Sequence, residues 1–415
     1  MQEEAIDVMA TAGNTILLSP TGTGKTLAFL LPVLEFLDHD NPEVQVLILV
    51  PSRELAIQIE QVIRNMGSGF KVNAIYGGRP ISKDKIELRH TPALLVGTPG
   101  RVLDHFRAGR FSKEHITTLV LDEFDKSLEI GFEAEMSEIL AALPNLRNRV
   151  LTSATEGVSV PEFVGMEHPR RINYLTKELN SQLTIKRVIS QEKDKRSNLV
   201  ELLQTLGGEP GIVFCNFKDS IDIVSEFLTA NGIGHSCFSG GMEQKDRERS
   251  LIKFRNGSCT VLLATDLAAR GIDIPELKFI IHYELPHRKE EFTHRNGRTA
   301  RVQEAGTAYV LHWKNEALPD FIPESKALKI TNTKEASAPS WETLFISRGR
   351  KDKISKGDIA GLFFKQGDLK NEQLGTIELK QDCAFVAVPK GLADTLVGKL
   401  NNSRLKKKKV RITLL

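Results

Sequence analysis

The sequence has few cysteines and no long apolar run. Its four cysteines are far apart in the 415 residues and form no Cys-x-x-Cys pair, a spacing that argues against a disulfide framework and against a zinc site. No stretch approaches the ~18 uninterrupted apolar residues of a membrane span, and the N-terminus lacks the basic start and apolar run of a signal peptide. We therefore expect reduced thiols, no membrane partner and a location in the cytoplasm.

The sequence also has little net charge, +3, but this charge is unevenly distributed. Residues 340–415 carry 16 Lys/Arg and 8 Asp/Glu, a local net charge of +8, which leaves −5 for the rest of the chain. A compact basic segment attached to a weakly charged body favours a polyanion-binding appendage. A solvated lysine-rich tail that serves solubility is the alternative.

The length and the apolar pattern predict more than one domain. At ~150 residues per domain the chain suggests two or three, and its 40% hydrophobic and 26% charged residues suit soluble globular domains. Short β-branched runs alternate with helical stretches, which predicts parallel sheets with helices on both faces. The predicted strands are residues 15–18, 46–50, 94–96, 119–121 and 150–151 in a first unit, and 212–214, 261–264, 279–282 and 308–311 in a second.

The last part of the chain has a different order. Residues 331–340 are rich in Thr, Asn, Ser, Ala and Pro and read as a linker. Beyond them we expect strand 343–347, helix 357–364, strands near 375–379 and 383–388, helix 392–400 and strand 410–414. This βαββαβ order matches the topology of an RNA-recognition motif (RRM). The predicted domains are thus residues 1–173, 183–330 and 341–415, joined by the linker 331–340.

A phosphate-binding loop is predicted between the first strand and the helix that follows it. Residues 19–26 read Ser-Pro-Thr-Gly-Thr-Gly-Lys-Thr, a glycine-rich loop whose backbone N–H groups can face nucleotide phosphates. Lys25 would reach the β- and γ-phosphates, and the Thr26 hydroxyl would bind Mg²⁺. Ser19 stands where the general pattern has glycine. The competing interpretation is a chance Gly-Thr turn before a helix.

Two carboxylates follow the apolar strand 119–121. Asp122 and Glu123 would lie where a parallel sheet presents its ligand-binding edge. Asp122 can hold Mg²⁺, mainly through water, while Glu123 orients or deprotonates the attacking water. The pair could instead cap the following helix.

The ordered set of motifs through both α/β units resembles the DEAD-box family of RNA helicases. Besides the phosphate loop, the set comprises Asp-Glu-Phe-Asp at 122–125, Pro-Ser-Arg-Glu-Leu-Ala at 51–56, Gly-Gly at 77–78, Thr-Pro-Gly-Arg at 98–101, Ser-Ala-Thr at 153–155, Gln244 with Arg247, Thr-Asp at 265–266 through Arg-Gly-Ile-Asp at 270–273, and His-Arg-Asn-Gly-Arg-Thr-Ala-Arg at 294–301. The resemblance implies two tandem RecA-like α/β domains that hydrolyse ATP with Mg²⁺ and bind RNA.

The resemblance also assigns roles to individual residues. The implied ATP-site residues are Gln2, Thr21, Gly22, Thr23, Gly24, Lys25, Thr26, Asp122, Glu123 and Asp273, with Arg298 and Arg301 as arginine fingers. The implied RNA contacts, mainly to phosphate and ribose, are Arg53, Gly78, Thr98, Arg101, Gln244, Arg247 and Thr265. Asp125, Ser153, Thr155 and His294 would couple hydrolysis to strand separation. RNA and ATP should then each raise the affinity for the other.

The chain departs from the family pattern at several positions. Phe124 replaces the usual alanine, and a large ring there must find space, which puts the turnover rate in doubt although all three carboxylates remain. Asn296 and Ala300 replace the usual isoleucine and glycine. Residues 1–6 resemble the end of the family's adenine-reading motif, with Gln2 as its glutamine, and the aromatic residue that normally precedes it is not in the sequence. A misplaced start, a fragment or weakened base selectivity would each account for this.

The C-terminal part resembles the RRM-like RNA-binding domain of the bacterial DbpA-type helicases. The resemblance implies that this domain holds a structured hairpin of large-subunit ribosomal RNA. Only Phe385 is available as a stacking aromatic around residues 382–388, so recognition is expected to rely on Arg348, Arg350, Lys351 and Lys353.

We therefore expect a monomeric ATP-dependent RNA helicase of ribosome assembly. Two alternatives stay open: a general RNA remodeler of cold shock or RNA decay, and an ATP-gated RNA clamp without useful hydrolysis.

Overall fold

The architecture follows the alternation of apolar strands and helices along the chain. The computed structural model describes residues 1–11, 13–20, 22–155, 160–175, 183–266, 277–299, 305–330 and 339–415. The predicted site residues Thr21, Asp273 and Arg301 lie outside these residues, as do Ala300 and residues 331–338 of the predicted linker. The described chain divides into two units, one up to residue 175 and the other from residue 183 on.

The described part of the first unit contains a seven-stranded parallel sheet in the order β3-β4-β2-β5-β6-β1-β7. The strands are β1 (Asn14–Leu18), β2 (Val46–Leu49), β3 (Val72–Ile75), β4 (Leu94–Gly97), β5 (Thr118–Leu121), β6 (Asn148–Ser153) and β7 (Arg170–Asn173). The helices are α1 (Gln2–Thr11), α2 (Lys25–Glu35), α3 (Arg53–Met66), α4 (Ile81–Glu87), α5 (Pro99–Arg107), α6 (Phe124–Ile130) and α7 (Glu133–Ala141), with the 3₁₀ turn η1 (Glu162–Val164).

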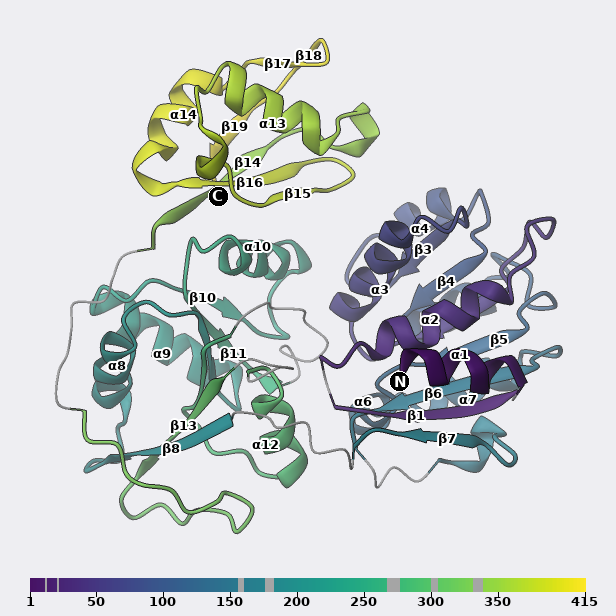
Figure 1. The fold of residues 1–415 in the computed structure, drawn as a ribbon, viewed down its shortest axis with the longest axis horizontal. Coiled ribbons are helices and arrows are strands. Elements are labelled where there is room, and N and C mark those ends of the chain that lie inside the picture. The colour runs from purple at the N-terminus through teal and green to yellow at the C-terminus, as the bar shows by residue number, and fades with distance from the viewer. Residues whose placement is uncertain are drawn as a thin grey trace. The chain divides into compact units, whose positions relative to one another are not determined.

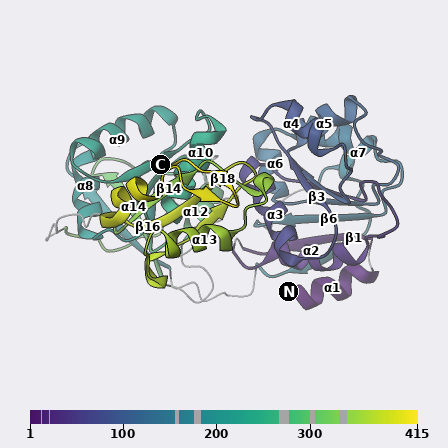
Figure 2. The same ribbon diagram turned by 90° about the horizontal axis from the view of Figure 1, so that it is seen from above.

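Helices cover both faces of this sheet, as Figure 2 shows. Side chains of α2 and α3 pack with Val46, Ile48 and Val120 on one face, while α5, α6 and α7 pack with the alternate strand residues, among them Leu47 and Leu119, on the other. A strand that is buried on both faces needs a continuous apolar run, and this is the pattern from which the strands were predicted.

The second unit contains a second parallel sheet and, after it, a smaller antiparallel sheet (Figure 1). The parallel sheet has the order β10-β11-β9-β12-β13-β8. Its strands are β8 (Leu183–Ser190), β9 (Gly211–Phe214), β10 (His235–Phe238), β11 (Val261–Ala264), β12 (Phe279–His282) and β13 (Gly306–Trp313), and its helices are α8 (Arg196–Thr205), α9 (Lys218–Ala230), α10 (Gln244–Arg255) and α12 (Lys289–Asn296).

The antiparallel sheet has the order β15-β16-β14-β19, the arrangement of an RRM. Its elements are β14 (Trp341–Ile346), η2 (Arg350–Asp352), α13 (Lys356–Lys365), η3 (Asn371–Gln373), β15 (Ile377–Leu379), β16 (Ala384–Pro389), η4 (Lys390–Leu392), α14 (Ala393–Leu400), the hairpin β17 (Arg404–Leu405) and β18 (Lys408–Lys409), and β19 (Ile412–Leu414). Helices α13 and α14 cover one face of this sheet (Figure 1) and form its core with Leu344, Ile346 and Val386.

The opposite face of this sheet carries Thr343, Phe345 and Phe385. The two rings meet edge to face at 5.7 Å, and Phe385 is buried. The Thr343 hydroxyl lies 3.2 Å from Asn256 Nδ2 and 2.6 Å from Ser258 Oγ, both just beyond α10. The third domain therefore contacts the second α/β domain through the sheet face that an ordinary RRM offers to RNA.

The predicted fold class, two parallel-sheet α/β domains followed by an RRM-like domain, is confirmed. The exact domain boundaries stay a prediction. None of the helices among the described residues has the length and apolar character needed to cross a bilayer.

Candidate ATP and RNA sites

The predicted ATP and RNA residues of the first unit divide between two halves of one sheet edge. The phosphate loop, Asp122 and Ser153 lie at the carboxyl ends of β1, β5 and β6, which are neighbours in the sheet. The segments that contain Arg53, Gly78 and Thr98 follow β2, β3 and β4, which form the other half. The carboxyl ends of parallel strands all lie at the same edge of the sheet. In open α/β sheets this carboxyl edge is where ligands bind.

The phosphate loop is held together by its own polar groups. The hydroxyls of Ser19 and Thr23 lie 2.7 Å apart, and Thr23 also donates to the Pro20 carbonyl at 2.8 Å. Lys25 Nζ donates to the carbonyl oxygens of Ser19 and Pro20. Gly22 and Gly24 have φ values of 81° and 89°, in the left-handed region that favours glycine. The loop leads directly into α2, whose N-terminus attracts phosphate.

Gln2 lies next to this loop. A Cβ atom at Gly24 would be 2.8 Å from the Gln2 Nε2 atom, which places the amide of Gln2 directly against the loop at Gly24. The structure thus brings Gln2 together with the loop residue Gly24, as a nucleotide-binding role requires. Thr26 follows in the first turn of α2 and is partly exposed.

Thr152, which the sequence did not single out, contacts both residues of the Asp-Glu pair, the carboxylate of Asp122 and the backbone of Glu123. Its hydroxyl donates to Asp122 Oδ1 and accepts the backbone N–H of Glu123 at 3.1 Å. Burial raises the pKa of Asp122, although the Thr152 hydrogen bond and the charge of Lys25 oppose that rise. Glu123 stands at the N-cap position of α6 in a left-handed conformation and makes no side-chain capping bond. This geometry gives the helix-cap interpretation no support.

The oxygen ligands available here suit Mg²⁺. Asp122 offers a buried carboxylate beside the charge of Lys25, and Thr26 offers a hydroxyl on the adjacent helix. Carboxylate, hydroxyl and phosphate oxygens are the ligands that this hard cation prefers, together with water.

The predicted coupling residues of the first unit are connected to one another. Thr155 Oγ1 donates to Asp125 Oδ2 at 3.2 Å, and Ser153 Oγ lies 3.2 Å from Thr155 Oγ1. Phe124 lies between Glu123 and Asp125 in the sequence. Its ring is fully buried among the core side chains of α5, α6 and α7. The fourth predicted coupling residue, His294, lies on α12 of the second unit and is buried, and so is Arg298, just beyond α12.

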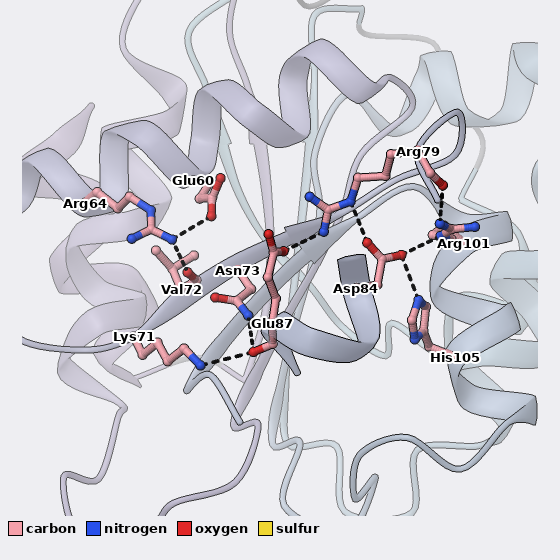
Figure 3. Close-up of polar contacts among 10 residues, drawn as sticks. All are labelled: Glu60, Arg64, Lys71, Val72, Asn73, Arg79, Asp84, Glu87, Arg101 and His105. Carbon is pink, nitrogen blue, oxygen red and sulfur yellow. Dashed lines mark hydrogen bonds and ion pairs between the residues drawn. The ribbon is translucent and has the colours of Figure 1, made fainter. Parts of the chain in front are cut away.

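The predicted RNA contacts of the first unit also come together. Arg53 begins α3, which Ser52 caps through Leu55 N at 3.2 Å. The Arg53 guanidinium lies so close to Gly78, at φ 83°, that any Cβ there would collide with it. Thr98 precedes α5 and is buried. Arg101 is only 9% exposed, and its guanidinium contacts Asp84 and the Arg79 carbonyl (Figure 3).

In the second unit the predicted RNA residues lie at the carboxyl ends of β10 and β11. Gln244 and Arg247 are in the first turn of α10, where Arg247 lies 4.8 Å over the Phe238 ring, and Thr265 directly follows β11.

Arg295 connects three strand ends in the same region. Its Nε and Nη2 atoms bind the Asp266 carboxylate at 2.8 and 2.5 Å, and Nη2 also donates to Asn216 Oδ1 at 2.7 Å. Nη1 donates to the Glu284 carbonyl at 2.7 Å. These partners follow β11, β9 and β12, so this buried arginine fixes the edge that carries Thr265.

The basic residues of the third domain gather around a loop and a hairpin. The loop carries the four predicted RNA residues Arg348, Arg350, Lys351 and Lys353, and the β17–β18 hairpin packs beside it. Lys408 Nζ binds Asp352 at 2.9 Å, and Lys406 Nζ donates to the Lys353 carbonyl at 2.8 Å. We call residues 348–353 and 404–411 together the basic patch.

Comparison with known proteins agrees with this arrangement. Three family models match successive segments: DEAD/DEAH box helicase over residues 1–163, helicase conserved C-terminal domain over residues 194–303, and DbpA RNA binding domain over residues 343–414. The chain is 30% identical to the ATP-dependent RNA helicase DbpA of Bacillus subtilis, over 99% of this chain and 93% of that protein. It is 32% identical to the Escherichia coli protein of the same name, over 100% and 94%.

A solved structure, Saccharomyces cerevisiae Dbp5 bound to RNA and ADP BeF3, is similar with a TM-score of 0.67 and 28% identity, over 76% of this chain and 83% of that one. The chain therefore belongs to the DEAD-box family of ATP-dependent RNA helicases, enzymes that hydrolyse ATP, in the branch that carries a DbpA RNA-binding domain.

Proposed function

We propose that this helicase remodels structured large-subunit ribosomal RNA during ribosome assembly, as a monomer in the cytoplasm. The observation that carries the proposal is the basic patch, within a domain that matches the DbpA RNA-binding domain over residues 343–414. Residues 340–415 have a net charge of +8, so electrostatic attraction to phosphate contributes much of the affinity.

The buried sheet face supports recognition through the basic patch. An ordinary RRM stacks bases on exposed aromatic rings of its sheet. Here Phe385 is buried, and Thr343 on the same face binds Asn256 and Ser258 of the second domain. Arg348, Arg350, Lys351 and Lys353 therefore remain the best candidates for RNA contacts, with the hairpin lysines beside them.

At the ATP site we propose that the phosphate loop residues 21–26 hold the triphosphate and that Gln2 faces the base. The Lys25 ammonium would leave the carbonyls of Ser19 and Pro20 for phosphate oxygens. Asp122 and Thr26 would hold Mg²⁺, which supplies positive charge at the phosphates. Glu123 would accept the proton of the attacking water, with its backbone held by Thr152.

The second α/β domain would supply the remaining groups. Arg298 and Arg301 would stabilise the charge that develops on the transferred phosphoryl group, and Asp273 would bind the ribose. Gln244, Arg247 and Thr265 would add RNA backbone contacts to those of Arg53, Gly78, Thr98 and Arg101 in the first domain. Asp125, Ser153, Thr155 and His294 would connect the two events.

The test is ATP turnover without RNA, with a generic RNA duplex, and with a large-subunit ribosomal RNA fragment that contains the family's hairpin. We expect strong stimulation by the ribosomal fragment at concentrations at which the duplex stimulates weakly. The double variant Lys351→Gln/Lys353→Gln should remove this preference, because it deletes charge from the basic patch. The matched control Lys365→Gln/Lys390→Gln deletes the same charge from exposed sites outside the patch and should keep the preference.

The other outcomes select the alternatives. Equal stimulation by both RNAs would favour a general RNA remodeler and overturn the ribosomal target. RNA binding without any RNA-stimulated phosphate release would favour an ATP-gated clamp, the alternative motivated by Phe124 beside the carboxylates.

A further inference from the structure

A fully buried carboxylate lies on α4, which in the chain lies between the strands β3 and β4 whose carboxyl ends carry proposed RNA contacts. Asp84, on α4, accepts Arg79 Nε at 2.5 Å on one oxygen. Its other oxygen accepts Arg101 Nε at 2.6 Å and the Nε2 of the buried His105 at 3.0 Å. Figure 3 shows these three groups converging on Asp84 from the loop before α4 and from α5. Nothing in the DEAD-box motifs of the sequence singled out Asp84 or His105.

The network keeps Asp84 ionised. Burial alone would raise the pKa of its carboxyl, but the His105 hydrogen bond and the charges of Arg79 and Arg101 outweigh burial and hold the pKa below its usual value. Arg110 Nη1 lies 3.1 Å from His105 Nδ1, and a guanidinium can only donate. His105 Nδ1 therefore accepts, and Nε2 carries the hydrogen that it donates to Asp84.

Asp84 also connects the segments that carry the proposed RNA contacts. Arg101 Nη2 donates to the Arg79 carbonyl at 2.7 Å, which joins α5 to the loop after β3. The Arg79 guanidinium is held a second time by Glu87 at 2.5 Å and stacks over Tyr76 at 5.0 Å.

The helix that carries Asp84 is anchored at its far end. Asn73 Nδ2, within β3, donates to the Glu87 carbonyl at 3.0 Å (Figure 3). The Gly77-Gly78 loop thus lies between two fixed points, β3 and α4. It faces Arg53 on one side and is bound to Arg101, three residues after Thr98, on the other.

We propose that Asp84 is a positioning residue for RNA binding: it holds Arg79 and Arg101 so that Arg101, together with Arg53, Gly78 and Thr98, belongs to a preorganised set of RNA backbone contacts. Asp84 itself does not touch RNA, and the proposal rests on the RNA assignment of this edge made above. A preorganised surface binds more tightly because fewer side chains and loop residues must be ordered on association.

The test uses the full-length chain and a single-stranded RNA without the ribosomal hairpin, so that binding reports the two α/β domains. Asp84→Asn keeps the size of the side chain and removes its charge. We expect the RNA dissociation constant, and the RNA concentration for half-maximal ATP turnover, to rise about tenfold. Turnover at saturating RNA should stay within about twofold, because bound RNA restores the same contacts.

Two further variants separate positioning from stability. Asp84→Glu retains the charge and should recover part of the RNA affinity, which also covers the case in which Asp84→Asn does not fold. Asp104→Asn removes an exposed carboxylate from the neighbouring α5 and should change RNA affinity less than twofold. Thermal melting followed by circular dichroism establishes that each variant is folded at the assay temperature.

Arg53→Gln tests the edge itself. If Arg53→Gln weakens RNA binding while folded Asp84→Asn binds as wild type, Asp84 has only a structural role and the proposal is overturned. If Arg53→Gln leaves RNA binding unchanged, the RNA assignment of this edge fails first and the positioning role fails with it. A rise in the half-maximal RNA concentration for Asp84→Asn, partly reversed in Asp84→Glu, supports it.

Discussion

Asn296 stands where related helicases usually have isoleucine, and the structure gives its amide a buried partner. Asn296 Oδ1 lies 3.1 Å from His282 Nε2, at the end of β12, and the imidazole is fully buried. This contact satisfies Asn296 Oδ1 and one nitrogen of His282, which offsets part of the cost of burying the two polar groups, whereas His282 Nδ1 has no hydrogen-bond partner among the described residues. The sequence revealed the substitution, but not the partner fourteen residues earlier in the chain.

This pair predicts an acid-sensitive step in stability. Burial lowers the pKa of His282 to about 3, against 6.5 in an unfolded chain. Between pH 6.5 and pH 3 the unfolded chain therefore binds a proton at His282 that the folded chain does not bind. The folded state keeps its full stability above pH 6.5 and loses stability as the pH falls toward 3. We expect the unfolding free energy to fall by about 2 kcal/mol between pH 6.5 and pH 5 from this group.

Chemical denaturation at both pH values measures this dependence. His282→Gln should lose about that much of the difference between the two pH values, whereas the exposed control His90→Gln should keep it. An unchanged pH dependence in His282→Gln would show that the imidazole is protonated in the folded protein.

Phe124 predicts a second residue-scale effect. The family usually has alanine here, but in this chain the Phe124 ring is fully buried in the core with side chains of α5, α6 and α7. We expect a loss of about 3–5 kcal/mol in unfolding free energy, because the truncation leaves a cavity. Phe217→Ala removes a ring that is 62% exposed and should change stability little. A near-neutral Phe124→Ala would mean that the neighbours collapse into the space.

At the scale of elements, the N-terminus of α13 holds the β17–β18 hairpin to the rest of the third domain. Ser355 Oγ accepts Asp358 N at 3.2 Å, and Asp358 Oδ2 accepts Ser355 N at 2.8 Å, a reciprocal cap of the helix. Lys406 from the hairpin binds the same carboxylate at 2.8 Å. The Lys406 and Ser355 contacts lower the pKa of Asp358 to about 2.

Removing this carboxylate should loosen both the helix and the hairpin. Asp358→Asn leaves the Ser355 N-cap in place and should cost about 1 kcal/mol in the unfolding transition of the third domain, because it weakens the reciprocal half of the capping box and removes the ion pair with Lys406. Because the folded pKa is depressed, the contribution of Asp358 is present above pH 3.8 and lost as the pH falls toward 2. Asp368→Asn, which breaks the exposed ion pair with Lys399, is the matched control and should cost less than about 0.5 kcal/mol. Equal losses in both variants would argue against the cap.

The strands that the sequence predicted are those whose residues are predominantly apolar. All nine strands predicted in the α/β units are present, because buried parallel strands are continuous apolar runs. Four described strands of these units were missed, β3, β7, β8 and β10, and all contain polar residues. For example, β7 (Arg170–Asn173) exposes two arginines, and β3 (Val72–Ile75) buries Asn73, whose amide binds the Glu87 carbonyl. The hydrogen-bond partners of such buried polar residues lie far away in the sequence. For the same reason the sequence identified the motifs but did not predict the roles of Thr152, Asp84 and His105.

At the scale of the whole molecule, the shared sheet edge predicts coupling between the two ligands. The ATP residues follow β1, β5 and β6, the RNA residues follow β2, β3 and β4, and both ligands are proposed to bind residues of the second α/β domain as well. If both favour the same conformation, saturating RNA should tighten a non-hydrolysable ATP analogue by roughly 5–150-fold, and the analogue should tighten RNA by the same factor.

Equilibrium titrations in both directions measure the two factors, which thermodynamics requires to be equal. Ser153→Ala/Thr155→Ala removes the hydroxyls that connect β6 to Asp125, and we expect it to reduce the coupling factor more than either affinity alone. Identical ATP affinity with and without RNA in the wild-type chain would rule the coupling out, and the two halves of the edge would then act as independent binding sites on one sheet.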